Sequence, residues 1–337
     1  MFCRLPSRLE CTGIREVKTL QENKTLYIVV PCYKEEAVLP ETAKRLKAKL
    51  HALTAQGKIS QASRIMFVND GSKDRTWEII SGLHGQDEIF SGVNLSRNRG
   101  HQNALLAGLM TAVQDADMIV SMDADLQDDI DAVDRMVDAY HAGYDVVYGV
   151  RSSRKSDSFF KRFTAEGFYN LMKLMGVDIV FNHADYRLMS RRAVEGLAQF
   201  KEVNLFLRGV VPQVGYSWTT VEYERAKRFA GESKYPLKKM IAFALDGITS
   251  FSIKPLRLIL FLGALIFVVS IIALIWALIA RAAGHTVSGW TSLMCSIWMI
   301  GGIQLLSLGV IGEYIDKIYG EAKARPRFII ERVLHKK

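Results

Sequence analysis

The sequence contains few cysteines. Its 337 residues include Cys3, Cys11, Cys32 and Cys295, and no pair of them has the spacing of metal ligands. This usage is typical of a soluble part that stays reduced and faces the cytosol. The first 24 residues also lack the apolar core of a secretory signal, so we expect only a short N-terminal extension there.

No nucleic-acid-binding motif accompanies the net charge of +9. Much of the positive charge instead lies beside two long apolar runs near the C-terminal end. Basic residues that flank membrane spans attract anionic lipid headgroups. We therefore expect a lipid bilayer, and no nucleic acid, to be the partner of this charge.

The two apolar runs are Leu256–Ala280, which has one charged residue, and Thr291–Gly312, which has none. About 20 apolar residues cross a bilayer, so these runs predict two transmembrane helices; two buried core helices are the alternative. The linker between them carries one Arg, whereas both outer flanks are strongly basic. The positive-inside rule then predicts a multi-pass protein of the cell (inner or plasma) membrane, with its soluble domain and both termini in the cytoplasm.

Before these runs, strands and helices alternate. Short apolar runs predict strands at 26–30, 64–68, 89–95, 118–122 and 145–150, and helices between them at 41–53, around 77–80, 102–113 and 130–142. Ser72 is the expected N-cap of the second helix. The pattern predicts an α/β fold with a mainly parallel sheet and helices on both faces. Further on we expect helices near 163–175 and 191–200, and a strand at 216–223.

The resulting domain plan has five parts. They are an extension at 1–24, an α/β domain at 25–235, an amphipathic membrane-interface helix at 236–254, two transmembrane helices at 255–313 and a basic cytoplasmic tail at 314–337.

Polar clusters follow four of the predicted strands: Pro31–Glu36, Asn69–Ser72, Ser96–Gly100 and Asp123–Gln127. Ligands of such sheets bind beyond the carboxyl ends of the strands, so we expect these clusters to form one site. Asp123 and Asp125 provide the oxygen ligands that Mg²⁺ or Mn²⁺ prefers when it is shared with substrate phosphates. An ordinary solvated loop is the alternative.

Each of the other clusters also has two interpretations. Asp70 either accepts a hydrogen bond from a base N–H, such as that of uracil, or belongs to a tight turn capped by Ser72. Pro31 and Tyr33 could enclose a base, with Glu35 reaching the ribose or the base, or Glu35 and Glu36 could simply lie at the start of a helix. The loop at 96–101 could meet phosphate or position the metal loop through Arg97 and backbone amides, or it could be a solvated loop. His101 is a weak ligand candidate there, and a surface residue is the alternative.

These motifs, in this order, resemble the family 2 glycosyltransferases, which have the Rossmann-like GT-A fold. The similarity extends to an Arg-rich segment and to Gly231-Glu232-Ser233-Lys234-Tyr235. With the predicted hairpin, the chain is most similar to polyprenyl-phosphate glycosyltransferases. Within these it resembles bacterial bactoprenol glucosyltransferases, which are relatives of dolichyl-phosphate mannose synthases. The resemblance covers about residues 25–325.

The resemblance implies a set of site residues and a homotetramer. Metal and diphosphate are assigned to Asp123, Asp125 and Gln127, and the nucleotide to Pro31, Tyr33, Glu35, Asp70 and Ser72. Arg151 and Asp185 join the two aspartates as catalytic candidates. The chain departs from the common Gly-Asp-Phe-Arg pattern at His183-Ala184-Asp185-Tyr186-Arg187. This departure leaves the sugar open.

The expected reaction transfers a hexose, with inversion, to a polyprenyl phosphate such as undecaprenyl phosphate for cell-envelope glycan modification. A phosphate monoester is largely dianionic at neutral pH, so it needs no general base. Candidates for holding the phosphates are Arg151, Arg154, Arg162, Arg187, Arg208 and Lys234. UDP-glucose is the first candidate donor, followed by UDP-N-acetylglucosamine, UDP-galactose and GDP-mannose. The alternatives are a processive polysaccharide synthase, whose Gln-x-x-Arg-Trp motif is missing, a nucleotide-binding regulatory module and a non-catalytic membrane scaffold.

Overall fold

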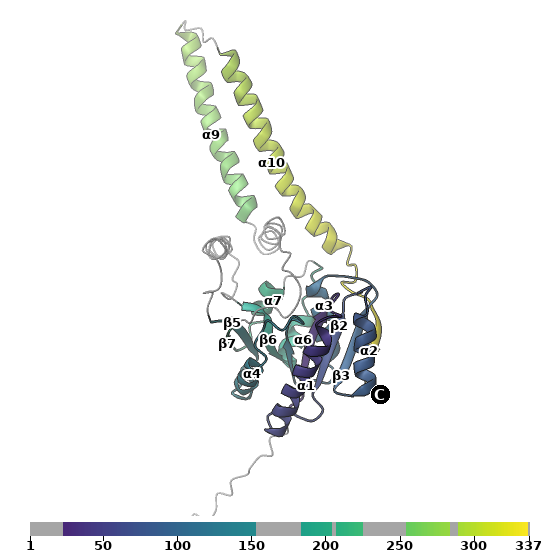
Figure 1. Ribbon diagram of the computed structural model, residues 1–337. Coiled ribbons are helices and arrows are strands. Elements are labelled where there is room, and N and C mark those ends of the chain that lie inside the picture. The colour runs from purple at the N-terminus through teal and green to yellow at the C-terminus, as the bar shows by residue number, and fades with distance from the viewer. Residues whose placement is uncertain (1–22, 153–182, 204–206, 225–253, 284–288, 336–337) are drawn as a thin grey trace, which may run out of the picture.

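The computed structural model describes residues 23–152, 183–203, 207–224, 254–283 and 289–335. Within these ranges an α/β domain contains an eight-stranded sheet, and two long helices extend away from it (Figure 1). The strands lie in the order β7-β5-β6-β4-β1-β2-β3-β8. Their bounds are β1 Leu26–Cys32, β2 Arg64–Asn69, β3 Phe90–Leu95, β4 Met118–Ser121, β5 Val146–Arg151, β6 His183–Ser190, β7 Trp218–Tyr223 and β8 Ile330–Leu334.

The sheet is mainly parallel, as the alternating pattern predicts. β1 pairs in parallel with both β2 and β4, β2 with β3, and β5 with β7. β6 lies antiparallel between β4 and β5, and β8 lies antiparallel against β3. β1 to β4 therefore run in one direction and end at the same edge of the sheet.

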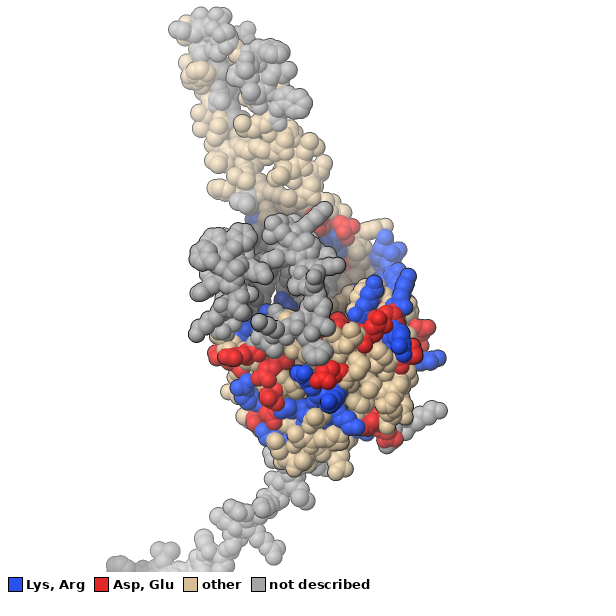
Figure 2. Space-filling model, in the orientation of Figure 1, with Lys and Arg blue, Asp and Glu red and all other residues tan. Residues whose placement is uncertain are grey.

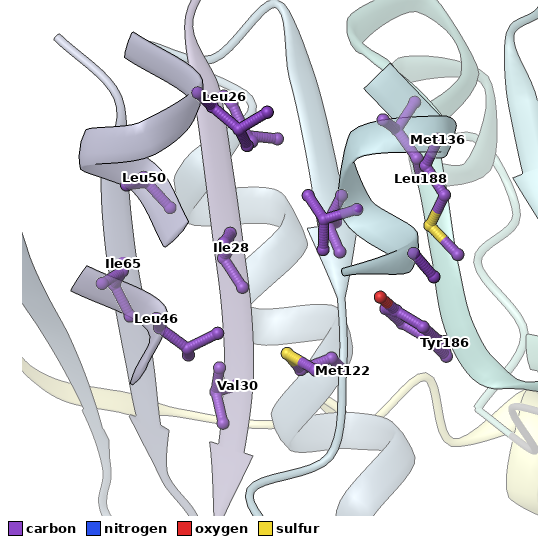
Figure 3. Packing of buried hydrophobic residues seen from close by; sticks show 14 of the residues in the cluster. Leu26, Ile28, Val30, Leu46, Leu50, Ile65, Met122, Met136, Tyr186 and Leu188 are labelled. Atoms are coloured by element: carbon purple, nitrogen blue, oxygen red, sulfur yellow. The ribbon is translucent and has the colours of Figure 1, made fainter. Parts of the chain in front are cut away.

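Helices cover both faces of the sheet, as predicted. Because successive side chains of a strand point to opposite faces, Ile28 packs on one side of β1 and Val29 on the other. The first face is covered by α1 (Leu39–Ala55), α2 (Thr76–Gln86) and α4 (Ala132–His141), whose apolar side chains pack with those of the strands. Figure 3 shows Leu46 and Leu50 of α1 and Met136 of α4 in this layer. The second face is covered by α3 (His101–Ala112), α6 (Arg191–Ala198) and α7 (Leu207–Gln213). Each large aliphatic side chain buried in these layers contributes about 1.5–3 kcal/mol to stability.

Two long helices follow the domain, α9 (Lys254–Ala282) and α10 (Trp290–Ala322). Both carry well-exposed apolar side chains, among them Leu260, Trp276 and Leu305. Charged side chains lie over the α/β domain, and the described upper part of the helix pair shows almost none (Figure 2). Within the residues described, no helix satisfies the combined requirement of length and apolarity for crossing a bilayer. The two-span hairpin stays a prediction.

The structure contains elements that the sequence pattern did not predict, and it contradicts the predicted role of Ser72. β6, α7 and β8 were not expected; β8 lies in the segment predicted to be a tail, and α10 continues into that segment as far as Ala322. Ser72 is not a helix N-cap, because α2 begins only at Thr76. The Ser72 hydroxyl instead accepts a hydrogen bond from the backbone N–H of Lys34, at 3.1 Å. The predicted helices at 163–175 and 236–254 lie outside the described residues.

Candidate active site

The segments after β1 and β2 are joined by hydrogen bonds that backbone N–H groups donate. The N–H of Asp70 donates to the carbonyl of Cys32 at 2.9 Å, which continues the pairing of the two strands. One turn further, the N–H of Glu35 donates to the Thr76 hydroxyl at 3.1 Å. These bonds, together with that from Lys34 to Ser72, place the predicted nucleotide residues on one side of the carboxyl edge.

Asp70 holds the loop that follows β3. Its carboxylate is almost fully buried and accepts hydrogen bonds from the backbone N–H groups of Arg99, at 2.7 Å, and Gly100, at 2.9 Å. Burial raises the pKa of Asp70, and these two donors only partly offset the rise. Gly71 has φ +60°, and a Cβ there would lie 2.4 Å from the backbone of Arg97. Only glycine fits this approach, so the two loops meet backbone to backbone.

The remaining predicted nucleotide residues differ in exposure. Pro31 is buried at the end of β1, Glu35 is partly buried, and 46% of Tyr33 is exposed. The Lys34 ammonium lies 5.5 Å from the centre of the Tyr33 ring. The structure therefore brings an exposed ring and a partly buried carboxylate to the loops that Asp70 and Ser72 organise, and their contact with a nucleotide stays a prediction.

The acidic turn, Asp123–Gln127, follows β4 at the same edge. Leu126 is buried and has φ 58°, a conformation that costs a non-glycine residue about 1–3 kcal/mol. The Thr42 hydroxyl donates to the Ala124 carbonyl at 2.9 Å, and the Gln127 N–H donates to Asp125 Oδ1 at 3.1 Å. The turn is thus held by a hydrogen bond from Thr42 of α1 and by one to its own Asp125 carboxylate.

The carboxylates around this turn fit a divalent cation that is shared with a substrate. Burial raises the pKa of Asp123, and the nearby negative charges of Asp185 and Asp125 raise it further against the opposing effect of His101. A cation would relieve this crowding of negative charge. Within the described residues, no group of three or more His, Cys, Asp or Glu side chains forms a complete metal site. Two carboxylates completed by phosphate oxygens suit Mg²⁺ better than an all-protein cage does.

Asp185 on β6 is the centre of a second charged group. Arg187 donates to Asp185 Oδ1 at 2.6 Å, and Arg208 of α7 donates to Oδ2 at 3.1 Å. Burial opposes ionisation of Asp185, but Arg208 and Arg187 outweigh it and hold its pKa well below the usual value. Nε2 of His101 lies 3.5 Å from Asp123 and 3.8 Å from Asp185, so it links this group to the acidic turn.

The placement of Arg187 does not fit direct phosphate binding. Only 1% of the residue is exposed, and its guanidinium also reaches the carbonyl of Leu207, at 3.5 Å. In this arrangement Arg187 holds Asp185, which in turn holds Arg208. Arg208 is partly exposed and remains a candidate for contact with a ligand phosphate.

Asp128 connects the acidic turn to β7. Burial and the charge of Asp123 raise the pKa of Asp128 to about 6, although a hydrogen bond from the Tyr223 hydroxyl, at 2.6 Å, opposes the rise. Arg151, at the end of β5, lies close to Tyr223 and Asp128. Within the described part of the chain, Nε of Arg151 is buried without a hydrogen-bond partner. A buried donor left in this way can bind an anionic ligand without losing another bond.

The structure therefore brings together Asp123, Asp125, Gln127, Asp185, Arg151 and Arg208. The candidates Arg154, Arg162 and Lys234 lie outside the described residues. Sequence reasoning named His101 only as a weak ligand candidate, with a surface residue as the alternative, and gave no role to Tyr223. The available signal for His101 was its place directly after Gly100, at the start of a helix that follows a strand. For Tyr223, the signal was its place at the end of a strand.

Comparisons with known proteins show the family of this chain. Residues 27–197 match the family described as Glycosyl transferase family 2, and residues 254–318 match the GtrB C-terminal hairpin. The chain belongs to glycosyl transferase family 2. It is a glycosyltransferase, and its sheet is the mostly parallel, Rossmann-like sheet of the GT-A fold.

Two curated relatives cover nearly the whole glycosyltransferase. "Uncharacterized glycosyltransferase YkoT" of Bacillus subtilis (strain 168) is 49% identical over 311 residues, which are 92% of each chain. "Prophage bactoprenol glucosyl transferase homolog" of Escherichia coli (strain K12) is 41% identical over 308 residues, which are 91% of this chain and 98% of the relative. A solved structure, glucosyl-3-phosphoglycerate synthase from Mycobacterium tuberculosis with phosphoglyceric acid, is 17% identical with a TM-score of 0.43, over 68% of this chain and 79% of that one.

Proposed function

We propose that this glycosyltransferase transfers one hexose from a nucleotide-sugar to a polyprenyl phosphate. Undecaprenyl phosphate is the first candidate acceptor and UDP-glucose the first candidate donor. The E. coli relative, which is named a bactoprenol glucosyl transferase homolog, supports both choices. The product would be a lipid-linked sugar for modification of a cell-envelope glycan.

The observation that carries the proposal is the pairing of two charged groups by His101. The acidic turn provides carboxylates for a cation and diphosphate, and Asp185 fixes the Arg208 guanidinium beside it. A transfer between two phosphates needs this combination, because one phosphate leaves with negative charge while the other arrives with it. Arg208 and Nε of Arg151, which has no hydrogen-bond partner among the described residues, suit the incoming phosphate.

Mg²⁺ or Mn²⁺ would be held by Asp123, Asp125 and Gln127, in the turn that Leu126 strains and Thr42 anchors. When bound, the cation supplies a counter-charge for the diphosphate that leaves. The protein's own residues orient the two substrates: the loops fastened by Asp70 hold the nucleotide side, and the arginines hold the acceptor side.

The bond change is a single displacement. An oxygen of the acceptor phosphate forms a bond to the anomeric carbon while the bond from that carbon to the diphosphate breaks, so the configuration inverts and gives a β-linked product from an α-linked donor. The acceptor is already dianionic near neutral pH, and no side chain has to remove a proton. The enzyme's contribution is alignment and charge stabilisation.

The acceptor's lipid chain requires a membrane beside the site. We propose that α9 and α10, with exposed Leu260, Trp276 and Leu305, lie in the inner or plasma membrane, with the α/β domain in the cytoplasm. The match of residues 254–318 to a family hairpin supports this topology. A homotetramer stays a prediction.

Direct transfer tests the proposal. Purified protein in detergent is incubated with undecaprenyl phosphate, Mg²⁺ or Mn²⁺, and one nucleotide-sugar at a time from UDP-glucose, UDP-N-acetylglucosamine, UDP-galactose and GDP-mannose. Mass spectrometry then looks for a lipid phosphate that carries one sugar. We expect product with UDP-glucose, and its loss in EDTA. Bound UDP without a lipid product from any donor would contradict the proposed acceptor.

A further inference from the structure

The strand β8 carries a side chain that reaches toward the nucleotide side of the site. β8 follows α10 and pairs antiparallel with β3, with Asn94 opposite Arg332. Just before β8, the carbonyl of Ile329 accepts a hydrogen bond from the N–H of Ser96 at 3.0 Å. Ser96 begins the loop that Asp70 holds. A segment from the far end of the chain is therefore fixed against the candidate site.

A series of hydrogen-bonded polar side chains leads from β8 toward the candidate site. Nδ2 of Asn94 donates to Oε2 of Glu331 at 2.8 Å, and Nδ2 of Asn69 donates to Oδ1 of Asn94 at 2.7 Å. Oδ1 of Asn69 then accepts the backbone N–H of Ser72 at 3.3 Å, and the Ser72 hydroxyl accepts the N–H of Lys34 at 3.1 Å. The four bonds cross from β8 over β3 and β2 to the loop after β1.

Glu331 sets the donor-to-acceptor direction of this series of hydrogen bonds. An ionised carboxylate only accepts hydrogen bonds, whereas an amide side chain both donates and accepts. Asn94 must therefore turn its NH₂ group toward Glu331, which leaves its oxygen for Asn69. Asn69 is 2% exposed, so its NH₂ group needs that oxygen, and its own oxygen then faces the Ser72 N–H.

We infer that Glu331 is a positioning residue for the turn Asp70–Ser72, acting through Asn94 and Asn69. The inference rests on the proposed function for its consequence, since this turn holds the nucleotide side of the site. In this scheme Glu331 acts through its hydrogen bond with Asn94 and not by contact with substrate. Its effect is to keep the Asn69 oxygen pointed at the turn, so that the turn is ordered before a nucleotide arrives.

The connection also reaches the long helices. α10 ends at Ala322 and β8 begins at Ile330, and Glu321 near the end of α10 accepts the N–H of Val203 at 2.9 Å. The same C-terminal segment thus contacts the chain shortly before α7, which carries Arg208.

Three substitutions distinguish a role of Glu331 in orienting the Asn94 amide from a role in packing alone. Glu331→Gln keeps an acceptor oxygen, Glu331→Ala removes the acceptor, and Glu331→Lys replaces it with a group that only donates. The lysine would favour the reversed orientation of Asn94 and place two NH₂ groups face to face at Asn69. Arg332→Ala and Arg332→Glu, on the same strand, are the matched controls for loss of a side chain and for a change of charge.

The first measurement is UDP binding to the intact protein in detergent, by calorimetry with Mg²⁺. We expect the UDP dissociation constant to rise about fivefold in Glu331→Ala and about tenfold or more in Glu331→Lys, where tenfold converts to about 1.4 kcal/mol. Glu331→Gln and both Arg332 variants should stay within about twofold, which is less than about 0.5 kcal/mol. With Asn94→Ala already present, Glu331→Ala should add little, because the two act in series.

The second measurement is amide hydrogen exchange of the free protein. Exchange at residues 69–72 should be faster in Glu331→Lys than in wild type and unchanged in Arg332→Glu. Equal binding and exchange in wild type and Glu331→Lys, or equal losses in the Arg332 controls, would overturn the inference. Absence of UDP binding in the wild type would instead count against the proposed function, and the exchange comparison would still decide the role of Glu331.

Discussion

Tyr223 and Asp128, which are 95 residues apart in the sequence, share a buried hydrogen bond of 2.6 Å. The bond fixes the residue directly after the acidic turn to the end of β7. Tyr223→Phe removes the donor while keeping the ring. We expect a loss of about 1–3 kcal/mol in the free energy of unfolding, together with reduced turnover. Urea unfolding and transfer assays measure both, and Tyr144→Phe, at an exposed position, is the control and should change neither.

Asp125→Asn tests the acidic turn. It keeps the size of the side chain but removes a charge that a cation would need, so we expect turnover to fall at least about 100-fold while the fold is retained. We expect a similar loss of turnover in Asp123→Asn. Asp131→Asn is the control, because Asp131 is an exposed aspartate outside the turn that pairs with Lys49 of α1. Near-normal turnover in Asp125→Asn would refute the metal assignment.

Removal of metal provides a separate test of the same turn. EDTA should abolish transfer by the wild type, and added Mg²⁺ or Mn²⁺ should restore it. In Asp125→Asn, saturating metal should restore little. Transfer that persists in EDTA at the wild-type rate would show that the carboxylates serve another purpose.

Asp185→Asn leaves the Arg187 guanidinium buried without its carboxylate. Removing one partner of a buried ion pair costs about 3–5 kcal/mol, so we expect strong destabilisation in urea or thermal unfolding. Arg208→Ala should destabilise less, because the Arg208 side chain is 34% exposed. It should nevertheless reduce transfer. If the two variants were equally stable, Asp185 would not be the organising residue of the group.

The pH dependence of stability tests Asp145, which lies at the edge of the sheet opposite the candidate site. Burial opposes its ionisation, but hydrogen bonds from Arg192, Ser217 and Ser190 outweigh burial and lower its pKa from 3.8. A lowered folded-state pKa contributes stability above about pH 4 that is lost as the pH falls through the folded-state value.

We therefore expect Asp145→Asn to be less stable at pH 7 by about 2 kcal/mol, and this difference to shrink below pH 4. Thermal unfolding from pH 3 to pH 7 measures it. Arg192→Ala should have a smaller effect, since two serine donors remain. A difference between Asp145→Asn and wild type that stayed constant with pH would contradict the assignment.

Much of the sheet could be predicted because its strands are apolar and end in turn residues. Leu26–Cys32 and Arg64–Asn69 are buried almost throughout, so their sequences carry the signal directly. β6 carries no such signal, because Asp185 and Arg187 on it are charged. Arg187 is buried and Asp185 is partly buried, and their charges are compensated by their mutual ion pair and by Arg208. Arg208 becomes visible as a partner only in three dimensions.

The site was predictable in part for the same reason. Acidic residues after a buried strand indicate the acidic turn, and parallel pairing brings the four loops to one edge. The partners of Asp70 could not be predicted, because they are backbone N–H groups of a different loop. β8 was missed because Glu331 and Arg332 lie in a segment whose composition is that of a basic tail, and an edge strand requires little apolar sequence.

The position of β8 has a consequence for the order of folding. β3 lacks its outer neighbour until residues beyond both long helices have been synthesised, because β8 is the strand that pairs with it there. An unpaired strand edge is a template for association with other chains. The sheet would be completed only after both long helices have been synthesised, and a chain interrupted within α10 would leave β3 open to aggregation.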